Sequence, residues 1–149
     1  MENLSSVIYV SLVTKGYSIR EAEAMLKVAR EARCLMDLTG IAVFANGMIM
    51  TIIEGDTENV KSYYKGVNQY IGVGLNNVIK ILDKSISNRS FPQYCLAFKS
   101  FDEHLLSLDD FKEEEDKIFF EQFLSSGNIV SKIIKEFIAD KIPRLFHLR

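Results

Sequence analysis

The most regular apolar pattern in the chain consists of two short runs, residues 40–45 and 48–53, joined by Asn46 and Gly47. An Asn-Gly pair tolerates the positive φ angles that a type I′ turn requires at both central positions, so the pattern predicts a β-hairpin. Both runs are apolar almost throughout, so neither face of the hairpin is expected to meet water. We therefore expect this hairpin at the centre of a sheet.

Three further stretches, residues 6–13, 77–85 and 94–99, are predicted to be strands. The first is rich in β-branched and aromatic residues, and the second has alternating apolar positions. In the first of them, alternation places a phenol and a hydroxyl, Tyr9 and Ser11, on one face and only aliphatic side chains on the other. The chain between the hairpin and the next predicted helix is expected to turn at Glu54-Gly55-Asp56, where the apolar run ends.

Two predicted helices flank the hairpin. The first covers residues 19–36, with Ser18 as its N-cap, and its interior is rich in alanine. Close packing on a sheet is the simpler explanation of that alanine content, and a flat group held between helix and sheet is the alternative. The second helix, with Asp56 or Thr57 as its cap, is expected to end near Tyr70.

Two amphipathic stretches, residues 108–124 and 129–142, predict a C-terminal helix pair, the second ended by Pro143. The element order strand-helix-strand-strand-helix-strand, with a fifth strand, predicts an α+β, ferredoxin-like fold: a mixed sheet with two helices on one face. We expect residues 1–101 to form this domain and residues 102–149 a helical extension that packs on its other face. Such a pair often carries subunit contacts, so we also expect a homo-oligomer.

Composition narrows the class of protein. The chain has 149 residues, 48% apolar and 26% charged, which is typical of one soluble globular domain. A net charge of -2 argues against a basic surface for nucleic acid. No apolar run reaches the length of a membrane span. The first residues lack the basic start and cleavage site of a secretory leader, so we expect a cytoplasmic protein.

The residues with reactive side chains show no catalytic or metal-binding pattern. Cys34 and Cys95 have neither metal-ligand spacing nor a CxxC motif, and we expect two reduced, mostly buried thiols. His104 and His147 lie far apart in the sequence, so no metal site is predicted. No nucleophile has a neighbouring base in the sequence, so we do not expect an enzyme.

Short motifs nevertheless occur in a familiar order. Tyr9 and Ser11 lie in the first predicted strand, Leu38-Thr39-Gly40 opens the second, Ile53-Glu54-Gly55 closes the third, and Ser90-Phe91-Pro92 precedes the fifth. In order and spacing these motifs resemble the BLUF domain, a family named for blue-light sensing using FAD. The resemblance implies the ferredoxin-like fold described above, a sensory function, FAD as the cofactor, and a protein partner that receives the signal.

The resemblance also implies a mechanism. In the family the flavin ring lies between the two helices that flank the sheet, and a tyrosine of the first strand gives an electron and a proton to the excited flavin. A glutamine of the third strand relays them and rearranges, and the fifth strand carries the change outward. The positions of this chain that match the cofactor-binding residues of the family are Tyr9, Ser11, Arg33, Thr51 and Tyr94.

Several of these positions depart from the family pattern. Thr51 stands where the family has the glutamine, and one hydroxyl cannot replace an amide that both donates and accepts. Arg33 replaces an asparagine that bonds the flavin, and Tyr94 replaces a tryptophan. Residues 72–75, GVGL, replace a charged run that holds the cofactor beyond the ring. Each lost contact is worth about 1–3 kcal/mol, which predicts much weaker flavin binding.

We therefore expect a sensory or regulatory BLUF-family protein whose photocycle is absent. The alternative is a flavin-free interaction module with the same fold, and an enzyme that binds another ligand in the same cleft is the least favoured reading. Tyr9 is either the photochemical donor or a half-buried phenol bonded to a neighbour. Arg33 either contacts an anionic ligand or forms an exposed pair with Asp37, one turn further on, and the exposed pair is favoured. The output is expected to pass through the C-terminal helices.

Overall fold

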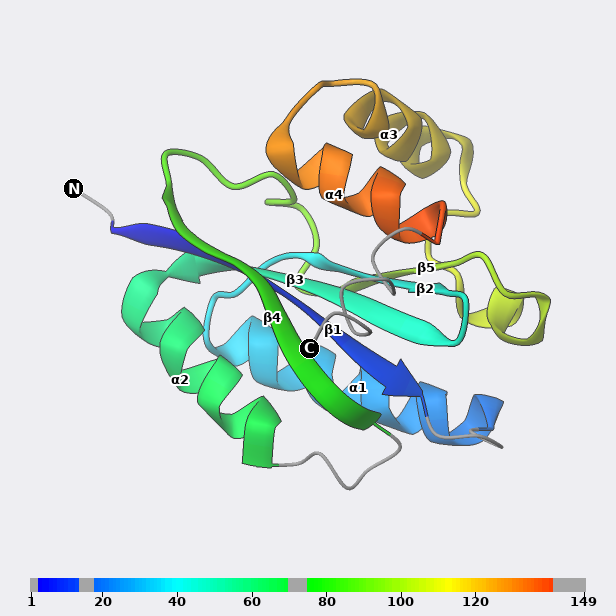
Figure 1. Ribbon diagram of the computed structural model, residues 1–149, viewed down its shortest axis with the longest axis horizontal. Coiled ribbons are helices and arrows are strands. Elements are labelled where there is room, and N and C mark those ends of the chain that lie inside the picture. Colours follow the sequence, from blue (N-terminus) through cyan, green and yellow to red (C-terminus); the bar gives the residue numbers. More distant parts are fainter. Residues whose placement is uncertain (1–2, 14–17, 70–74, 141–149) are drawn as a thin grey trace.

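Five strands form one mixed sheet in the computed structural model, which describes residues 3–13, 18–69 and 75–140 (Figure 1). The strand order is β4-β1-β3-β2-β5, and all neighbours are antiparallel except β2 and β5. The bounds are β1 (Leu4–Val13), β2 (Ile41–Ala45), β3 (Met48–Asp56), β4 (Leu75–Ile86) and β5 (Ala97–Ser100). This topology confirms the ferredoxin-like α+β fold.

The predicted hairpin is confirmed as the β2–β3 pair. Asn46 and Gly47 have φ angles of 56° and 75°, the left-handed values that a type I′ turn needs. The side chains of β2, and those of β3 up to Gly55, are buried, and β3 lies in the middle of the sheet. The turn expected at residues 54–56 is wrong. β3 continues through these residues because β1 starts at Leu4 and pairs with them.

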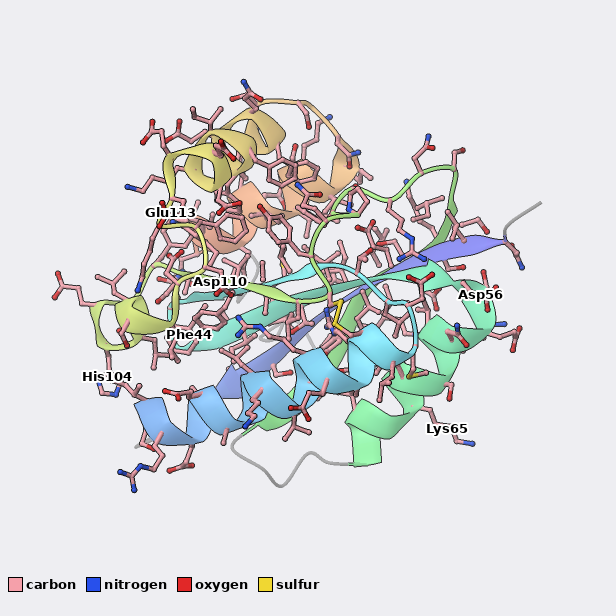
Figure 2. All side chains as sticks on the ribbon, turned by 180° about the vertical axis from the view of Figure 1, so that it is seen from behind. Phe44, Asp56, Lys65, His104, Asp110 and Glu113 are labelled. Carbon is pink, nitrogen blue, oxygen red and sulfur yellow. A yellow bond between two sulfur atoms is a disulfide. The ribbon has the colours of Figure 1, made fainter. Side chains whose placement is uncertain are left out.

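Helices α1 (Ile19–Leu35) and α2 (Thr57–Gln69) lie side by side on one face of the sheet (Figure 1). Ser18 caps α1 by accepting a hydrogen bond from the Glu21 amide, as predicted. Asp56 caps α2 in the same way. Phe44 of β2 points toward α1, where the small side chain of Ala22 allows close packing (Figure 2). On the same face of the sheet, α2 packs on β1 and β3 through Val60.

The C-terminal helices α3 (Glu114–Leu124) and α4 (Ile129–Ile138) cover the other face, as expected (Figure 1). Phe120, Ile134 and Phe137 are buried there against aliphatic residues of the sheet. The Asn46 side chain at the hairpin turn donates to the carbonyl oxygen of Phe137 at 3.3 Å. The hairpin is therefore held by helices on both faces.

The single helix predicted over residues 108–124 is wrong. A short 3₁₀ helix, η1 (Glu103–Leu108), is followed by extended chain before α3 begins. Two acidic side chains explain the interruption, since Asp109 accepts from the Ser100 amide and Asp110 accepts from the Phe98 amide. These bonds complete the hydrogen bonding of β5 and require Asp109 and Asp110 to lie alongside it rather than in a helix.

Other boundaries also differ from the predictions, and two of them have a clear cause. β5 begins at Ala97 rather than at residue 94, because Tyr94 closes a turn with its amide bonded to the Phe91 carbonyl. α4 ends at Ile138, and Asp140 then adopts a φ of 61°, so the chain leaves the helix before the predicted end. Pro143 lies outside the described residues. No helix in the described ranges is long and apolar enough to span a membrane.

Candidate functional site

Three of the predicted site residues lie together on the face of the sheet that α1 and α2 cover. Tyr9 of β1 is directly opposite Thr51 of β3 in the antiparallel register, and Ser11 follows two residues later on the same face. Their side chains are buried, with exposed fractions of 5% for Tyr9, 6% for Thr51 and 1% for Ser11. The cross-strand pair thus places a phenol beside a threonine hydroxyl, where the family places a phenol beside an amide.

Arg33 in the last turn of α1 extends into the same layer and is only 1% exposed. Its Nη1 donates to the carbonyl oxygens of Ile52, at 3.3 Å, and Cys95, at 3.4 Å. The guanidinium carbon lies 5.3 Å from the centre of the Tyr63 ring on α2, a cation–π contact. The Arg33 side chain therefore occupies the space between the two helices, above the sheet.

The expected surface pair of Arg33 with Asp37 is wrong. α1 ends at Leu35, and Asp37 has a φ of 53°, so the two residues are not on one helical face. Asp37 pairs instead with Arg89, whose Nη2 lies 3.3 Å from the Asp37 carboxylate. Arg33 thus lies on the buried face of α1 with Ala22 and Leu26, and the end of the helix leaves Asp37 at the surface.

The positive charge of Arg33 has no acidic partner among the described residues, whose ion pairs all involve other cations. Among the described residues, Arg33 Nε and Ser11 Oγ are also buried without a hydrogen-bond partner. A buried polar group without a partner costs free energy, and a buried charge costs more. The layer between the two helices and the sheet therefore contains, close to Tyr9, two buried groups that could donate further hydrogen bonds.

Burial raises the pKa of Tyr9 from 10.0 to about 12. The charge of Arg33 acts in the opposite direction, as do hydrogen bonds from Thr51 and Arg33, but desolvation is the larger effect. The phenol is therefore neutral near pH 7. Tyr9 is also more buried than the half-buried phenol expected from the sequence.

We expect the Tyr9 phenol to titrate near pH 12 in the folded chain and near 10 in the unfolded chain. Because the pKa of Tyr9 is higher in the folded chain, the neutral phenol contributes fully to the free energy of unfolding below pH 10. This contribution is lost as the pH rises from 10 toward 12. Two pKa units correspond to about 3 kcal/mol. The measurement is a tyrosinate absorbance titration of the wild type minus that of Tyr9→Phe, repeated in urea. Titration of Tyr9 near 10 in the folded chain would contradict this prediction.

Tyr94, the remaining predicted cofactor residue, lies away from this group. Its hydroxyl donates to the Asp116 carboxylate of α3 at 2.5 Å, and its ring contacts Phe111 and Phe119. These contacts belong to the layer between the sheet and the C-terminal helices. The structure therefore brings Tyr9, Ser11, Arg33 and Thr51 together and directs the Tyr94 side chain toward the C-terminal helices instead.

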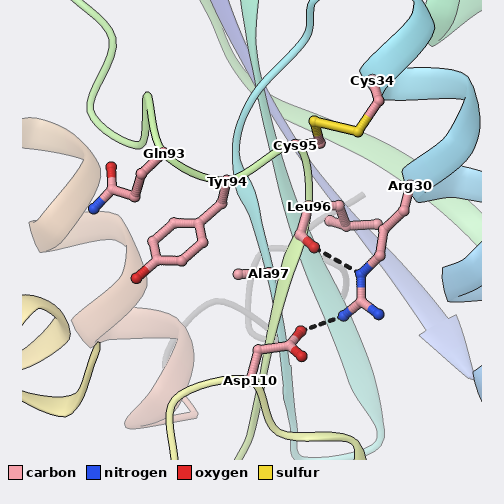
Figure 3. Close-up of a pocket in the computed structure, with 8 residues that line it drawn as sticks. All are labelled: Arg30, Cys34, Gln93, Tyr94, Cys95, Leu96, Ala97 and Asp110. Atoms are coloured by element: carbon pink, nitrogen blue, oxygen red, sulfur yellow. Dashed lines mark hydrogen bonds and ion pairs between the residues drawn. A yellow bond between two sulfur atoms is a disulfide. The ribbon is translucent and has the colours of Figure 1, made fainter. Parts of the chain in front are cut away.

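The expectation of two reduced thiols is wrong, because Cys34 and Cys95 form a disulfide (Figures 2 and 3). They are 61 residues apart in the sequence, but the fold places the end of α1 beside the segment that leads into β5, with a Cα–Cα distance of 5.4 Å. Cys34 is exposed and Cys95 is half-buried. Such a pairing depends on the tertiary arrangement and leaves no pattern of spacing in the sequence.

Glu54 has a structural role that the sequence did not reveal. It is buried at the end of β3, and its carboxylate accepts hydrogen bonds from the amides of Ser90, at 2.7 Å, and Phe91, at 2.5 Å. Burial raises the pKa of this carboxyl group, and the two amide hydrogen bonds oppose that rise. Glu54 thus fixes the loop that precedes β5. An acidic residue at the end of an apolar strand was the available clue.

These residues do not fit the flavin ring that the resemblance implies. The space between α1 and α2 is filled by the Arg33 side chain, which lies against Tyr63 and bonds the Ile52 carbonyl. Thr51 provides no amide beside Tyr9. Two hollows of about 410 and 450 Å³ lie elsewhere, and both are lined by Arg30 and Cys34. The GVG stretch at residues 72–74 lies outside the described residues.

The fold and the Tyr9–Thr51 pair define a ferredoxin-like domain whose helix-covered sheet face carries a buried phenol. The family model of sensors of blue light using FAD, the BLUF family, matches residues 4–97. The chain belongs to the BLUF family, whose domains are sensory modules. A search of curated proteins found no match.

Solved structures agree with the fold. The BLUF protein BlrB in its dark state has a TM-score of 0.64 and 17% identity, over 86% of this chain and 99% of that one. Klebsiella pneumoniae BlrP1 with FMN and cyclic diGMP has a TM-score of 0.70 and 20% identity, over 93% of this chain and 35% of that one. A bacterial light-regulated adenylyl cyclase has a TM-score of 0.62 and 18% identity, over 90% of this chain and 36% of that one.

Proposed function

We propose that this chain is a BLUF-family sensory or regulatory protein that does not run the flavin photocycle. The burial of Arg33 carries the proposal. Its guanidinium lies between α1 and the Tyr63 ring of α2, where the family places the flavin ring, and it hydrogen-bonds the Ile52 carbonyl. A ring could enter only if this side chain left.

The residue opposite Tyr9 supports the same proposal. A photocycle of the family type needs a group that accepts a hydrogen bond from the phenol, donates to the flavin and then exchanges these roles. An amide has separate donor and acceptor atoms for this, whereas Thr51 has one hydroxyl. Even with a flavin bound, Tyr9 would lack the relay through which an electron transfer is converted into a stable rearrangement.

A flavin-free interaction module is the form of this function that the geometry favours. Its output would be a contact with a separate protein, through the C-terminal helices that cover the far face of the sheet. Ile118 of α3 and Ile129 of α4 are 43% and 45% exposed, so apolar side chains are open to a partner on that side. We propose that residues 102–149 act with the domain of residues 1–101 as one unit.

A second candidate is a chain that binds flavin but does not switch. The unpartnered Arg33 Nε and Ser11 Oγ favour it, because a ligand with hydrogen-bond acceptors would satisfy both groups. In that case Arg33 would rotate and bind the edge of the ring, while Thr51 would still prevent the rearrangement.

The absorbance spectrum of the purified chain, before and after addition of FAD and under blue light, tests the proposal. We expect a colourless protein that takes up no FAD. A flavin spectrum that is unchanged by blue light would support the second candidate and exclude a flavin-free module. A flavin spectrum that shifts to longer wavelength under blue light and recovers in the dark would overturn the proposal.

A further inference from the structure

The disulfide of Cys34 and Cys95 lies at a surface that small molecules can reach. The hollow of about 410 Å³ in Figure 3 is lined by both cysteines, together with Arg30, Asp110 and Tyr94. The second hollow, of about 450 Å³, is lined by Cys34, Arg30, Glu31 and Leu35 but not by Cys95. Cys34 can thus be approached without passing Cys95.

We propose that this disulfide is an exchange site for a low-molecular-weight thiol, which attacks Sγ of Cys34. A thiolate attacks a disulfide sulfur in line with the S–S bond. The hollow lined by Cys34 but not by Cys95 gives an incoming thiol access to Cys34. The exposure of Cys34 and the partial burial of Cys95 favour attack at Cys34. The inference does not depend on whether the chain binds flavin.

The exchange balances without another reactant. The incoming thiolate forms a new S–S bond to Cys34 Sγ, the bond between Cys34 and Cys95 breaks, and Cys95 leaves as a thiolate. The sulfur of the incoming thiol is oxidised to the disulfide level, and that of Cys95 is reduced. On the side of Cys95, Arg33 Nη1 is 3.4 Å from the main-chain carbonyl oxygen of Cys95, and Arg30 lines the same hollow as both cysteines.

The bond that breaks is one of several ties between α1 and the start of β5. Arg30 Nε donates to the Leu96 carbonyl oxygen at 2.9 Å, and its Nη2 pairs with Asp110, as the dashed lines in Figure 3 show. Asp110 in turn accepts from the Phe98 amide. Exchange would remove the covalent member of this set and loosen the remaining ones. The modification would therefore change how α1 holds the edge strand β5.

The test uses the full chain, folded and oxidised, incubated with reduced glutathione. Free thiols are then blocked with iodoacetamide, and the peptides are examined by mass spectrometry. We expect glutathione on Cys34 and the blocking group on Cys95. We also expect the rate to stay constant as urea is added below the unfolding transition, because the native protein reacts.

Three results would overturn the proposal: glutathione mainly on Cys95, a rate that rises with urea in parallel with global unfolding, or a purified chain with two free thiols that oxidised glutathione does not link. A Cys95→Ala chain carrying glutathione on Cys34 gives an independent readout by hydrogen exchange. Its Ala97 and Phe98 amides should exchange faster than in the disulfide form. The matched control is a Cys34→Ala chain, which should not be modified at residue 34 and should carry little glutathione.

Discussion

Replacing Arg33 by asparagine and Thr51 by glutamine together is expected to tighten FAD binding at least about thirtyfold, which corresponds to about 2 kcal/mol. Arg33→Asn removes the guanidinium from the space between α1 and α2 and leaves an amide that both donates and accepts. Thr51→Gln places a second amide directly opposite Tyr9. Each regained hydrogen bond is worth about 1 kcal/mol. Titration of the quenching of FAD fluorescence measures the change.

The matched control is the double variant Arg33→Ala, Thr51→Ala, which opens the same space but supplies no amide. If the two double variants bind FAD equally well, steric exclusion by Arg33 is the whole effect and the amides contribute nothing. If neither binds better than the unchanged chain, contacts outside the ring limit binding, and the replacement of the charged run at residues 72–75 becomes the main loss.

The fold was largely predictable because its signals are local. Asn46 and Gly47 specify a turn type through their own backbone freedom, and Ser18 caps a helix through a hydrogen bond to a residue three positions on. The errors occur where a distant partner decides the local conformation. Asp109 and Asp110 lie in a stretch with a helical pattern of apolar residues. The amides of Phe98 and Ser100 in β5 donate to their carboxylates and so keep both residues outside α3.

The candidate site could be predicted in its positions but not in its contacts. Alternation along β1 is enough to place Tyr9 and Ser11 on one face, but β3 is apolar on both faces and gives no such signal for Thr51. The family resemblance supplies the pairing of Tyr9 with Thr51. Arg33 points inward because it lies on the same face of α1 as the buried Ala22 and Leu26. The absence of a pair with Asp37 depends on where α1 ends. The pairing of Cys34 with Cys95 depends on two elements meeting in space, and no spacing of two cysteines encodes that.

Contacts between protein groups alone join β3, α1 and β5, and they would hold a BLUF fold together if its photochemistry were lost. Glu54 joins the end of β3 to the loop before β5 through the amides of Ser90 and Phe91, and this connection involves no flavin. Arg30 and the disulfide join α1 to the same region. The elements that would relay a light signal to β5 are therefore linked by the protein's own groups. A different input at α1 would reach β5 by the same contacts.

Phe137→Ala is expected to lower the free energy of unfolding by about 3–5 kcal/mol, because the ring is fully buried between α4 and the sheet and its removal leaves a cavity. If the C-terminal helices and the sheet are one cooperative unit, the loss should appear everywhere. Urea unfolding followed by circular dichroism should remain a single transition with a lower midpoint. Amide hydrogen exchange should accelerate by the same factor in β1 and in α4.

Ile129→Ala on the same helix is the control, since that side chain is 45% exposed and its truncation should change stability by less than about 1 kcal/mol. Accelerated exchange confined to α3 and α4, with β1 unchanged, would instead mean that the helices detach from a sheet that stays folded. The single-unit arrangement would then be wrong, and a partner would meet the exposed sheet face itself. The Phe137 variant therefore distinguishes an output surface made by the helices from one that the helices cover.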